Sequence, residues 1–175
     1  MFNCLPKKTE MKKLIIVRHS RAEDQTSLIT DFERSLTERG KSVARQMAKK
    51  LKEKEKNPGV FITSPAFRAL ETALIFAGEF KIESDEVILN SKMYFRMNSQ
   101  VLDEIFSQTS DDTDAITIFG HNPSFSDIAN AYSREGCDYM PKCGIAVIYF
   151  NVKNWTEVIR SKGKLELFLK PEKTL

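Results

Sequence analysis

The stretch Leu14-Ile15-Ile16-Val17-Arg18-His19-Ser20 decides the fold of this chain. An apolar, β-branched run that ends in a polar triplet is typical of a buried strand that stops at a loop. A second run of this kind, Ala115-Ile116-Thr117-Ile118-Phe119-Gly120, is followed by His121. The chain has only two histidines, and each stands just past such a run. Because ligands of open α/β sheets bind beyond the carboxyl ends of the strands, we expect both imidazoles to lie in one crevice.

Around these two runs, the hydrophobic pattern predicts short strands that alternate with helices. Strands are expected at 13–17, 60–63, 86–89, 115–119, 145–150 and 165–169, the last two as an antiparallel hairpin. Helices are expected from a cap at Ser35 or Thr37 to about Lys54, from the N-cap Ser64 onward, at 99–108 and at 125–133. This order predicts a three-layer α/β/α sandwich around a mostly parallel sheet. We expect a single domain at residues 12–175, preceded by a loose extension at residues 1–11.

Composition excludes several classes of function. The net charge is only +3 and no long basic block occurs, so we expect no nucleic-acid partner. No apolar run approaches the roughly 20 residues that a membrane span requires, so we expect no membrane partner. The three cysteines are odd in number and lack CxxC spacing, which argues against a disulfide framework or a zinc site. A reducing, cytoplasmic location fits this usage.

Four side chains at predicted strand ends and helix starts define a candidate site. Arg18 and His19 end the first strand, Arg68 lies in the first turn of a helix, and His121 ends a later strand. Arginine binds phosphate oxygens through its planar fork, and a helix N-terminus adds backbone N–H donors. A histidine among such donors can attack phosphorus through a ring nitrogen. The pattern therefore predicts a pocket for a phosphoryl group.

These residues also carry a family resemblance. Arg18-His19-Ser20 resembles the arginine–histidine–glycine signature of the histidine phosphatase superfamily, which has the phosphoglycerate mutase-like fold. The segments 34–40 (Arg-Ser-Leu-Thr-Glu-Arg-Gly) and 64–72 (Ser-Pro-Ala-Phe-Arg-Ala-Leu-Glu-Thr) resemble its next two motifs. Gly120-His121-Asn122-Pro123 resembles its second histidine motif. The order and spacing agree from about Lys12 to Phe150, and the short chain is most similar to the phosphohistidine phosphatase branch.

The resemblance implies a role for each matching residue. It implies that His19 is the phosphorylated nucleophile, that Arg18, Arg68 and His121 hold the phosphate, and that Arg34 approaches it from a loop. Asn122 either orients His121 or forms a turn with Pro123, and it joins Arg34 and Ser20 as a candidate substrate-binding residue. No metal or organic cofactor is implied. The implied substrate is phosphohistidine on a protein, for which a phosphorelay domain is a candidate.

The sequence departs from the family pattern in two ways. Ser20 replaces the usual glycine, and its hydroxyl either crowds the loop or donates to the phosphate. No residue matches the glutamate that larger relatives use as a general acid, so Glu23, Asp24 and Glu86 are the open candidates. Phosphohistidine leaves as imidazole, which is protonated near pH 7, so the missing acid favours a phosphoramidate substrate.

Three alternatives remain at the level of sequence. A phosphatase of this kind could act on small sugar or nucleotide phosphates instead of a protein. A phosphate- or phosphoprotein-binding module without turnover would need the same cationic pocket. A zinc site could combine the two histidines with Asp24 or Asp127, although the flanking arginines would repel the cation.

Overall fold

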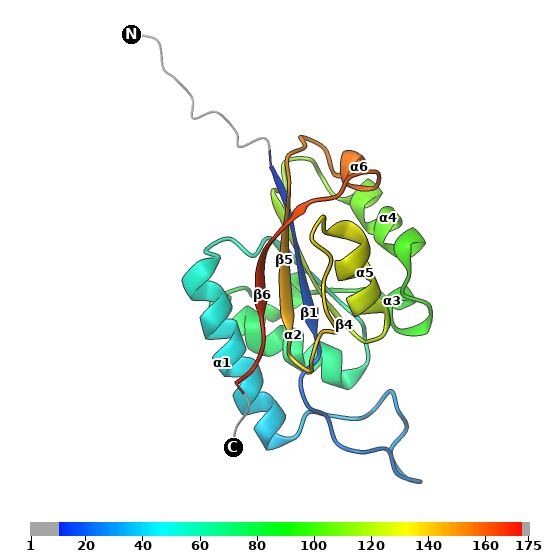
Figure 1. Ribbon diagram of the computed structural model, residues 1–175. Helices are drawn as coiled ribbons and strands as arrows, with labels where there is room; N and C mark the ends of the chain where they lie inside the picture. Colours follow the sequence, from blue (N-terminus) through cyan, green and yellow to red (C-terminus); the bar gives the residue numbers. More distant parts are fainter. Residues whose placement is uncertain (1–10, 173–175) are drawn as a thin grey trace.

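The computed structural model describes residues 11–172, so the expected extension at residues 1–11 lies outside it, apart from Met11. Within this range the chain forms a six-stranded sheet in the order β3-β2-β4-β1-β5-β6 (Figure 1). The strands are β1 (Lys12–Arg18), β2 (Val60–Thr63), β3 (Ile88–Leu89), β4 (Ala115–Gly120), β5 (Ile145–Phe150) and β6 (Lys164–Leu169).

The sheet is mostly parallel, as the sequence predicts. The pairs β3–β2, β2–β4 and β4–β1 are parallel, whereas β5 runs antiparallel to both β1 and β6. Only the short helix α6 (Trp155–Val158) lies between β5 and β6, which explains why these strands pair as a hairpin.

Helices cover both faces of the sheet, which completes the predicted three-layer sandwich (Figure 1). On one face lie α1 (Glu38–Lys54) and α2 (Phe67–Phe80). On the other lie α3 (Lys92–Phe95), α4 (Ser99–Gln108), α5 (Ser124–Tyr132) and α6, while residues Ser84–Glu86 form a 3-10 turn, η1.

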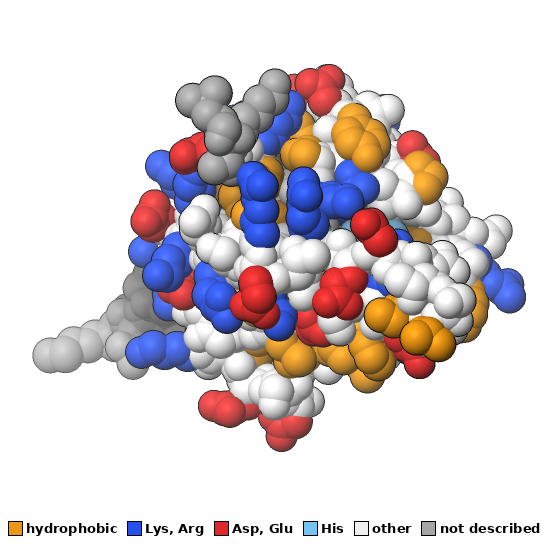
Figure 2. All heavy atoms as spheres, turned by 90° about the horizontal axis from the view of Figure 1, so that it is seen from below, with side chains coloured by type: hydrophobic (Ala, Val, Ile, Leu, Met, Phe, Trp, Pro, Cys, Tyr) orange, Lys and Arg blue, Asp and Glu red, His pale blue; other side chains and the backbone are white. Residues whose placement is uncertain are grey.

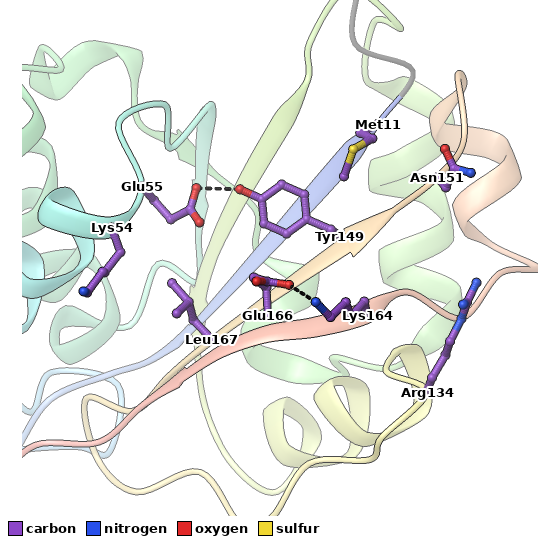
Figure 3. Close-up of a pocket in the computed structure, with 9 residues that line it drawn as sticks. All are labelled: Met11, Lys54, Glu55, Arg134, Tyr149, Asn151, Lys164, Glu166 and Leu167. Carbon is purple, nitrogen blue, oxygen red and sulfur yellow. Dashed lines mark hydrogen bonds and ion pairs between the residues drawn. The ribbon is translucent and has the colours of Figure 1, made fainter.

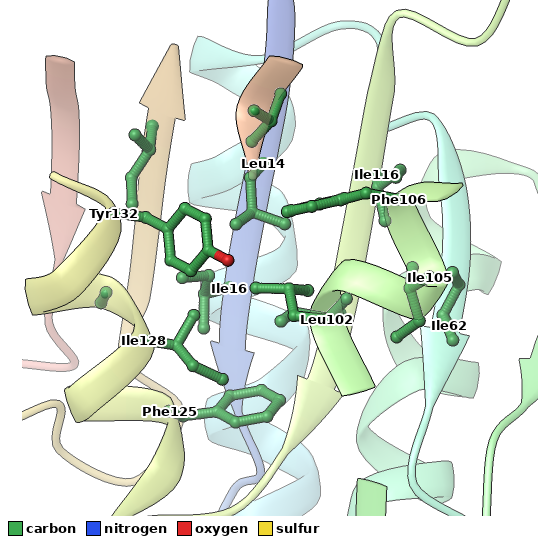
Figure 4. Close-up of a cluster of buried hydrophobic side chains, with 14 of the residues drawn as sticks. Leu14, Ile16, Ile62, Leu102, Ile105, Phe106, Ile116, Phe125, Ile128 and Tyr132 are labelled. Atoms are coloured by element: carbon green, nitrogen blue, oxygen red, sulfur yellow. The ribbon is translucent and has the colours of Figure 1, made fainter. Parts of the chain in front are cut away.

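Strand β1 holds the two helical layers together because its side chains alternate between them. Leu14 and Ile16 pack with residues of α4 and α5 in one apolar cluster (Figure 4), whereas Ile15 and Val17 pack with residues of α1 and α2 in the other. All four side chains are fully buried, which explains their continuous apolar run. Burial of each such side chain contributes about 1.5–3 kcal/mol, so the strand that presents His19 is firmly fixed.

Two predicted boundaries are wrong for physical reasons. Ser64 does not cap α2, because its backbone N–H continues the strand ladder to Phe119 and the helix begins only at Phe67. The strand expected at 86–89 shrinks to Ile88–Leu89, because Glu83 and Glu86 close a capping box around η1. The helix at 99–108 is confirmed, and Thr37 rather than Ser35 caps α1 by accepting from the Gly40 N–H.

Between residues 11 and 172, no helix combines the length and the apolar character that crossing a membrane requires.

Candidate active site

The register of β1 against β4 brings the two histidines together. Arg18 pairs with Gly120 in this parallel ladder, so the next residue of each strand leaves the sheet at the same edge. The His19 N–H also donates to the Gly120 carbonyl at 2.9 Å. As a result, the rings of His19 and His121 lie with their centroids 5.1 Å apart. The two imidazoles therefore lie close together at one edge of the sheet, as the sequence predicts.

The surroundings of His19 leave one of its ring nitrogens with a free lone pair. Its Nδ1 lies 2.7 Å from the Ser20 carbonyl oxygen, which can only accept, so Nδ1 carries the hydrogen and Nε2 keeps its lone pair. The side chain is buried, with 7% of its surface exposed. Burial, followed by the neighbouring His121 and the charges of Arg68 and Arg18, lowers the His19 pKa from 6.5 to about 3. The ring is therefore neutral at pH 7.

His121 is neutral for similar reasons and is held by Ser64. Burial and the charge of Arg68 lower the His121 pKa to about 4. Its Nε2 lies 2.8 Å from the Ser64 Oγ, and Ser64 reaches it because β2 ends beside β4. Sequence reasoning assigned Ser64 to a helix cap and so missed this contact. The position of Ser64 directly after a strand was the available signal.

Arg18 reaches toward the loop that precedes β5. Its Nη1 donates to the Tyr139 hydroxyl at 2.7 Å and to the Met140 carbonyl at 2.8 Å. Its guanidinium also lies 5.2 Å from the centroid of the Tyr139 ring, a cation–π distance. These contacts hold the guanidinium close enough to lower the pKa of both histidines.

Arg68 and Arg34 converge on a carboxylate that sequence reasoning missed. Arg68 Nη2 donates to Asp31 Oδ2 at 2.9 Å, and Arg34 Nη1 donates to Asp31 Oδ1 at 2.9 Å. Arg68 Nη1 also donates to the Asp31 backbone carbonyl, and Arg34 Nε to that of Glu23. Arg68 is 6% exposed, so this pairing fixes a nearly buried cation.

Asp31 is ionised in this setting. Its burial opposes ionisation, but hydrogen bonds from Arg34 and Arg68 outweigh that effect and lower its pKa to about 2. The Tyr94 hydroxyl donates to the same carboxylate at 3.1 Å, and the Tyr94 ring lies edge-on to His121. The spacing of Asp31 three residues before Arg34 was the only signal for it in the sequence, and Tyr94 had none.

The structure gives Ser20 a role different from the expected one. Its hydroxyl donates to the Gly40 carbonyl at 2.8 Å, and its N–H donates to Thr72 Oγ1 at 3.1 Å. The hydroxyl hydrogen is therefore used to anchor the loop to α1, instead of being offered to a phosphate. The non-glycine residues with positive φ, among those described, are Lys81 and Cys143, so serine at position 20 carries no such strain.

The expected general acids lie elsewhere. Glu23 and Asp24 are exposed on the loop after His19, and no contact from either carboxylate to a histidine or arginine of the site occurs among residues 11–172. Glu86 is bound to the Glu83 N–H at the start of β3, away from the carboxyl ends of the strands.

Several buried polar atoms around the two histidines lack a hydrogen-bond partner within the described part of the chain. They are Arg18 Nε, His121 Nδ1 and Asn122 Oδ1, while Asn122 Nδ2 donates to the Met140 carbonyl at 3.1 Å. Buried polar atoms are rarely left unpaired unless a ligand or water meets them. An arginine donor and a neutral imidazole beside a second arginine suit a tetrahedral oxyanion. Over the same residues, no group of three or more His, Cys, Asp or Glu side chains is placed to hold a metal, so the zinc site with Asp24 or Asp127 does not form.

A cavity of about 670 Å³ lies at the end of the sheet opposite to the two histidines (Figure 3). Met11, before β1, and Asn151, after β5, line it. Its one buried carboxylate, Glu55, is already bonded to Lys13 at 2.7 Å and to the Tyr149 hydroxyl at 2.8 Å. Glu166 of the lining pairs with Lys164 at 2.7 Å, so both carboxylates of this cavity are already bonded, and neither histidine lines it.

Comparisons with known proteins agree with this geometry. Residues 14–90 match the model of the histidine phosphatase superfamily (branch 1). The matched range contains His19, Arg34 and Arg68, and the resemblance stated from the sequence is confirmed. No curated protein matches the chain by sequence.

Solved structures share the fold over most of the chain. The protein histidine phosphatase SixA, solved with tungstate, is 18% identical with a TM-score of 0.76, and the match covers 91% of this chain and 97% of SixA. The SixA protein of Agrobacterium tumefaciens is 21% identical with a TM-score of 0.74, covering 91% of this chain and 98% of the other. A mycobacterial glucosyl-3-phosphoglycerate phosphatase is 10% identical with a TM-score of 0.63, covering 90% and 98%. At these identities the matches establish the fold, and the substrate must be argued from the site.

Proposed function

We propose that this protein is a metal-independent phosphatase that hydrolyses protein phosphohistidine through a phosphohistidine intermediate on His19. The observation that carries the proposal is the Nδ1–Ser20 hydrogen bond, which leaves Nε2 as a neutral nucleophile beside two arginines. The tungstate-bound SixA supports it, since tungstate is a tetrahedral oxyanion like phosphate.

In the first step, His19 Nε2 attacks phosphorus in line with the leaving group. The new P–Nε2 bond forms as the substrate's P–N bond breaks. The electron pair returns to the departing ring, whose other nitrogen has taken up one proton from solvent, so that it leaves as neutral imidazole. Arg18 and Arg68 stabilise the charge on the equatorial oxygens. With the Ser64 hydroxyl donating to Nε2, His121 carries its hydrogen on the unpartnered Nδ1 as a further donor.

In the second step, water attacks the phosphoryl group on His19. The P–Nε2 bond breaks, its electron pair returns to the ring, and inorganic phosphate and a proton leave. Arg34 and Asn122 are proposed to line the substrate side of the pocket, and no metal or organic cofactor takes part in either step.

The state of Asp31 favours a phosphoramidate substrate. This carboxylate, which contacts Arg68 and Arg34, has a pKa of about 2 and holds no proton to give at pH 7. An alkoxide leaving group needs such a proton during the reaction, whereas the second ring nitrogen of phosphohistidine can be protonated by solvent near pH 7, so that the ring leaves as neutral imidazole. The exposed side chains of Phe95 and Tyr139 lie beside the residues of the site and offer apolar contact surface to a protein partner. A phosphorelay domain is one example of such a partner.

We also propose that residues 12–175 act as a single domain in the cytoplasm. The free thiols of Cys137 and Cys143 are consistent with a reducing compartment.

The test is turnover of a phosphohistidine protein and of a chromogenic aryl phosphate, each with and without a chelator. We expect hydrolysis of the phosphoprotein that resists the chelator and disappears in His19→Ala. Faster turnover of small phosphate esters than of the phosphoprotein would favour the small-molecule phosphatase. Tight phosphate binding without any turnover would favour the binding module.

A further inference from the structure

A second cavity of about 380 Å³ lies against the catalytic loop, and its lining is strongly basic. Ser20 lies at its inner end, and Arg21, Arg39 and Lys142 supply its cations. We call this cavity the basic groove. Its lining contains one carboxylate, Glu172, whose Oε1 is already paired with Lys50 at 2.5 Å.

The basic groove is attached directly to the loop that carries His19. On the α1 side, Ser20 donates to the Gly40 carbonyl, which places Arg39 one residue from a fixed contact. On the opposite side, the Cys143 N–H donates to the carbonyls of both Arg18 and His19. Lys142 therefore also lies one residue from a fixed contact. The backbone that carries Arg39 and Lys142 is therefore anchored to the loop of the proposed nucleophile, and Arg21 follows His19 by two residues.

These cations are available to a partner. Arg21, Arg39 and Lys142 are all exposed, and among residues 11–172 none of their side chains takes part in a hydrogen bond or ion pair. Nearby lysines differ, since Lys41 pairs with Glu38 and Lys50 with Glu172. Figure 2 views this edge of the molecule and shows Lys and Arg side chains gathered beside the small exposed area of histidine.

We propose that the basic groove docks acidic side chains that flank the phosphohistidine of the substrate protein. The inference rests on the proposed function and adds to it the chemistry of the partner surface. The three cations come from three separate segments and stand exposed around an open groove, an arrangement that meets several spread carboxylates. A second anionic group on a small substrate would instead call for converging, buried donors. Charge complementarity of this kind acts mainly on association and selectivity.

The test compares two phosphohistidine peptides of equal length, one flanked by glutamates and one by lysines. We expect kcat/KM of the wild type to favour the glutamate peptide by about tenfold at low salt. The double variant Arg39→Glu/Lys142→Glu should abolish or reverse this preference. The charge-matched control Arg45→Glu/Lys49→Glu, on exposed positions of α1 outside the groove lining, should keep it. Aryl phosphate turnover should be unchanged in all three proteins, which also reports correct folding.

Equal hydrolysis of both peptides by the wild type, or an unaltered preference in the groove variant, would overturn the docking role and leave the phosphatase proposal standing. Loss of turnover of a small bis-anionic ester in the groove variant, with the peptide preference intact, would also overturn it. If neither peptide is hydrolysed, the proposed function fails. The groove is then judged by fluorescence anisotropy of the unphosphorylated glutamate peptide, whose binding must be lost in the groove variant and retained in the control.

Discussion

Asp31 adds to the site a negative charge that the sequence did not predict. It places a negative charge against Arg68 and Arg34, two arginines assigned to phosphate binding. The carboxylate holds both guanidinium groups in place, but it also repels an incoming phosphate dianion. Geometry and charge therefore act in opposite directions at this position.

The variant Asp31→Asn separates these two effects. The amide oxygen still accepts from Arg68, while the negative charge is removed. We expect the inhibition constant for inorganic phosphate to fall roughly three- to tenfold, the effect of one nearby charge in a partly exposed site. Competitive inhibition of aryl phosphate hydrolysis measures it, and an unchanged or higher inhibition constant would contradict the role of the charge. Asp31→Ala, which removes the acceptor as well, should lower kcat.

Arg68 is expected to act in the transition state. Its replacement by alanine removes a donor to the equatorial oxygens and should lower kcat/KM by about 10² or more. Arg68→Lys should recover little of this loss, because an ammonium group cannot reproduce a planar fork. Steady-state kinetics of both variants with aryl phosphate provide the check, and near-wild-type activity in Arg68→Ala would remove this residue from the mechanism.

The neutral His19 makes stability depend on pH. Its pKa falls from 6.5 to about 3 on folding, so between these values the unfolded chain binds a proton that the folded chain does not. The stabilisation from the neutral ring is complete above 6.5 and is lost as the pH falls toward about 3. The free energy of unfolding should therefore drop more steeply from about pH 7 to pH 4 in the wild type than in His19→Gln. Parallel slopes in denaturant titrations of the two proteins would rule out this burial effect.

At the scale of elements, the sequence predicted the ends of the strands better than the conformation of the loops beyond them. The apolar runs before His19 and His121 were sufficient to place both rings at one edge, because parallel strands share a direction. The same reasoning could not place Asp31, since its position depends on how a polar loop folds over α2. Ser64 was assigned to the wrong role because serine–proline is typical of a helix start, whereas here the strand ladder extends through Ser64.

A close contact between α1 and the loop that follows β1 gives a prediction about stability. A Cβ at Gly40 would lie 2.0 Å from the Arg21 carbonyl oxygen, so Gly40→Ala must push the helix and the loop apart. We expect a loss of about 1–3 kcal/mol of stability, with reduced activity. A Cβ at Gly78 of α2 meets nothing within 4 Å, so Gly78→Ala is the matched control and should stabilise by about 0.5–1 kcal/mol. Equal thermal stability of the two variants would contradict the assigned contact.

At the scale of the whole molecule, the sheet separates two regions with different uses. One end carries the histidines, the arginines that surround them and the basic groove, whereas the carboxylates of the cavity at the other end are paired. The fold class followed from the alternating pattern of runs, and the proximity of the two histidines followed from where those runs end. The identity of the partner could not be predicted in this way, because it depends on exposed side chains such as Arg39 and Lys142, which no folding constraint selects.

We propose that His19 Nε2 carries the phosphoryl group during turnover. The most direct measurement is rapid quenching of the protein with a phosphoryl donor under alkaline conditions, followed by mass spectrometric mapping of the phosphorylated residue. We expect one acid-labile phosphoryl group on His19, absent from His19→Ala and formed and lost at rates that match turnover. A phosphoryl group on any other residue, or full turnover by His19→Ala, would contradict it.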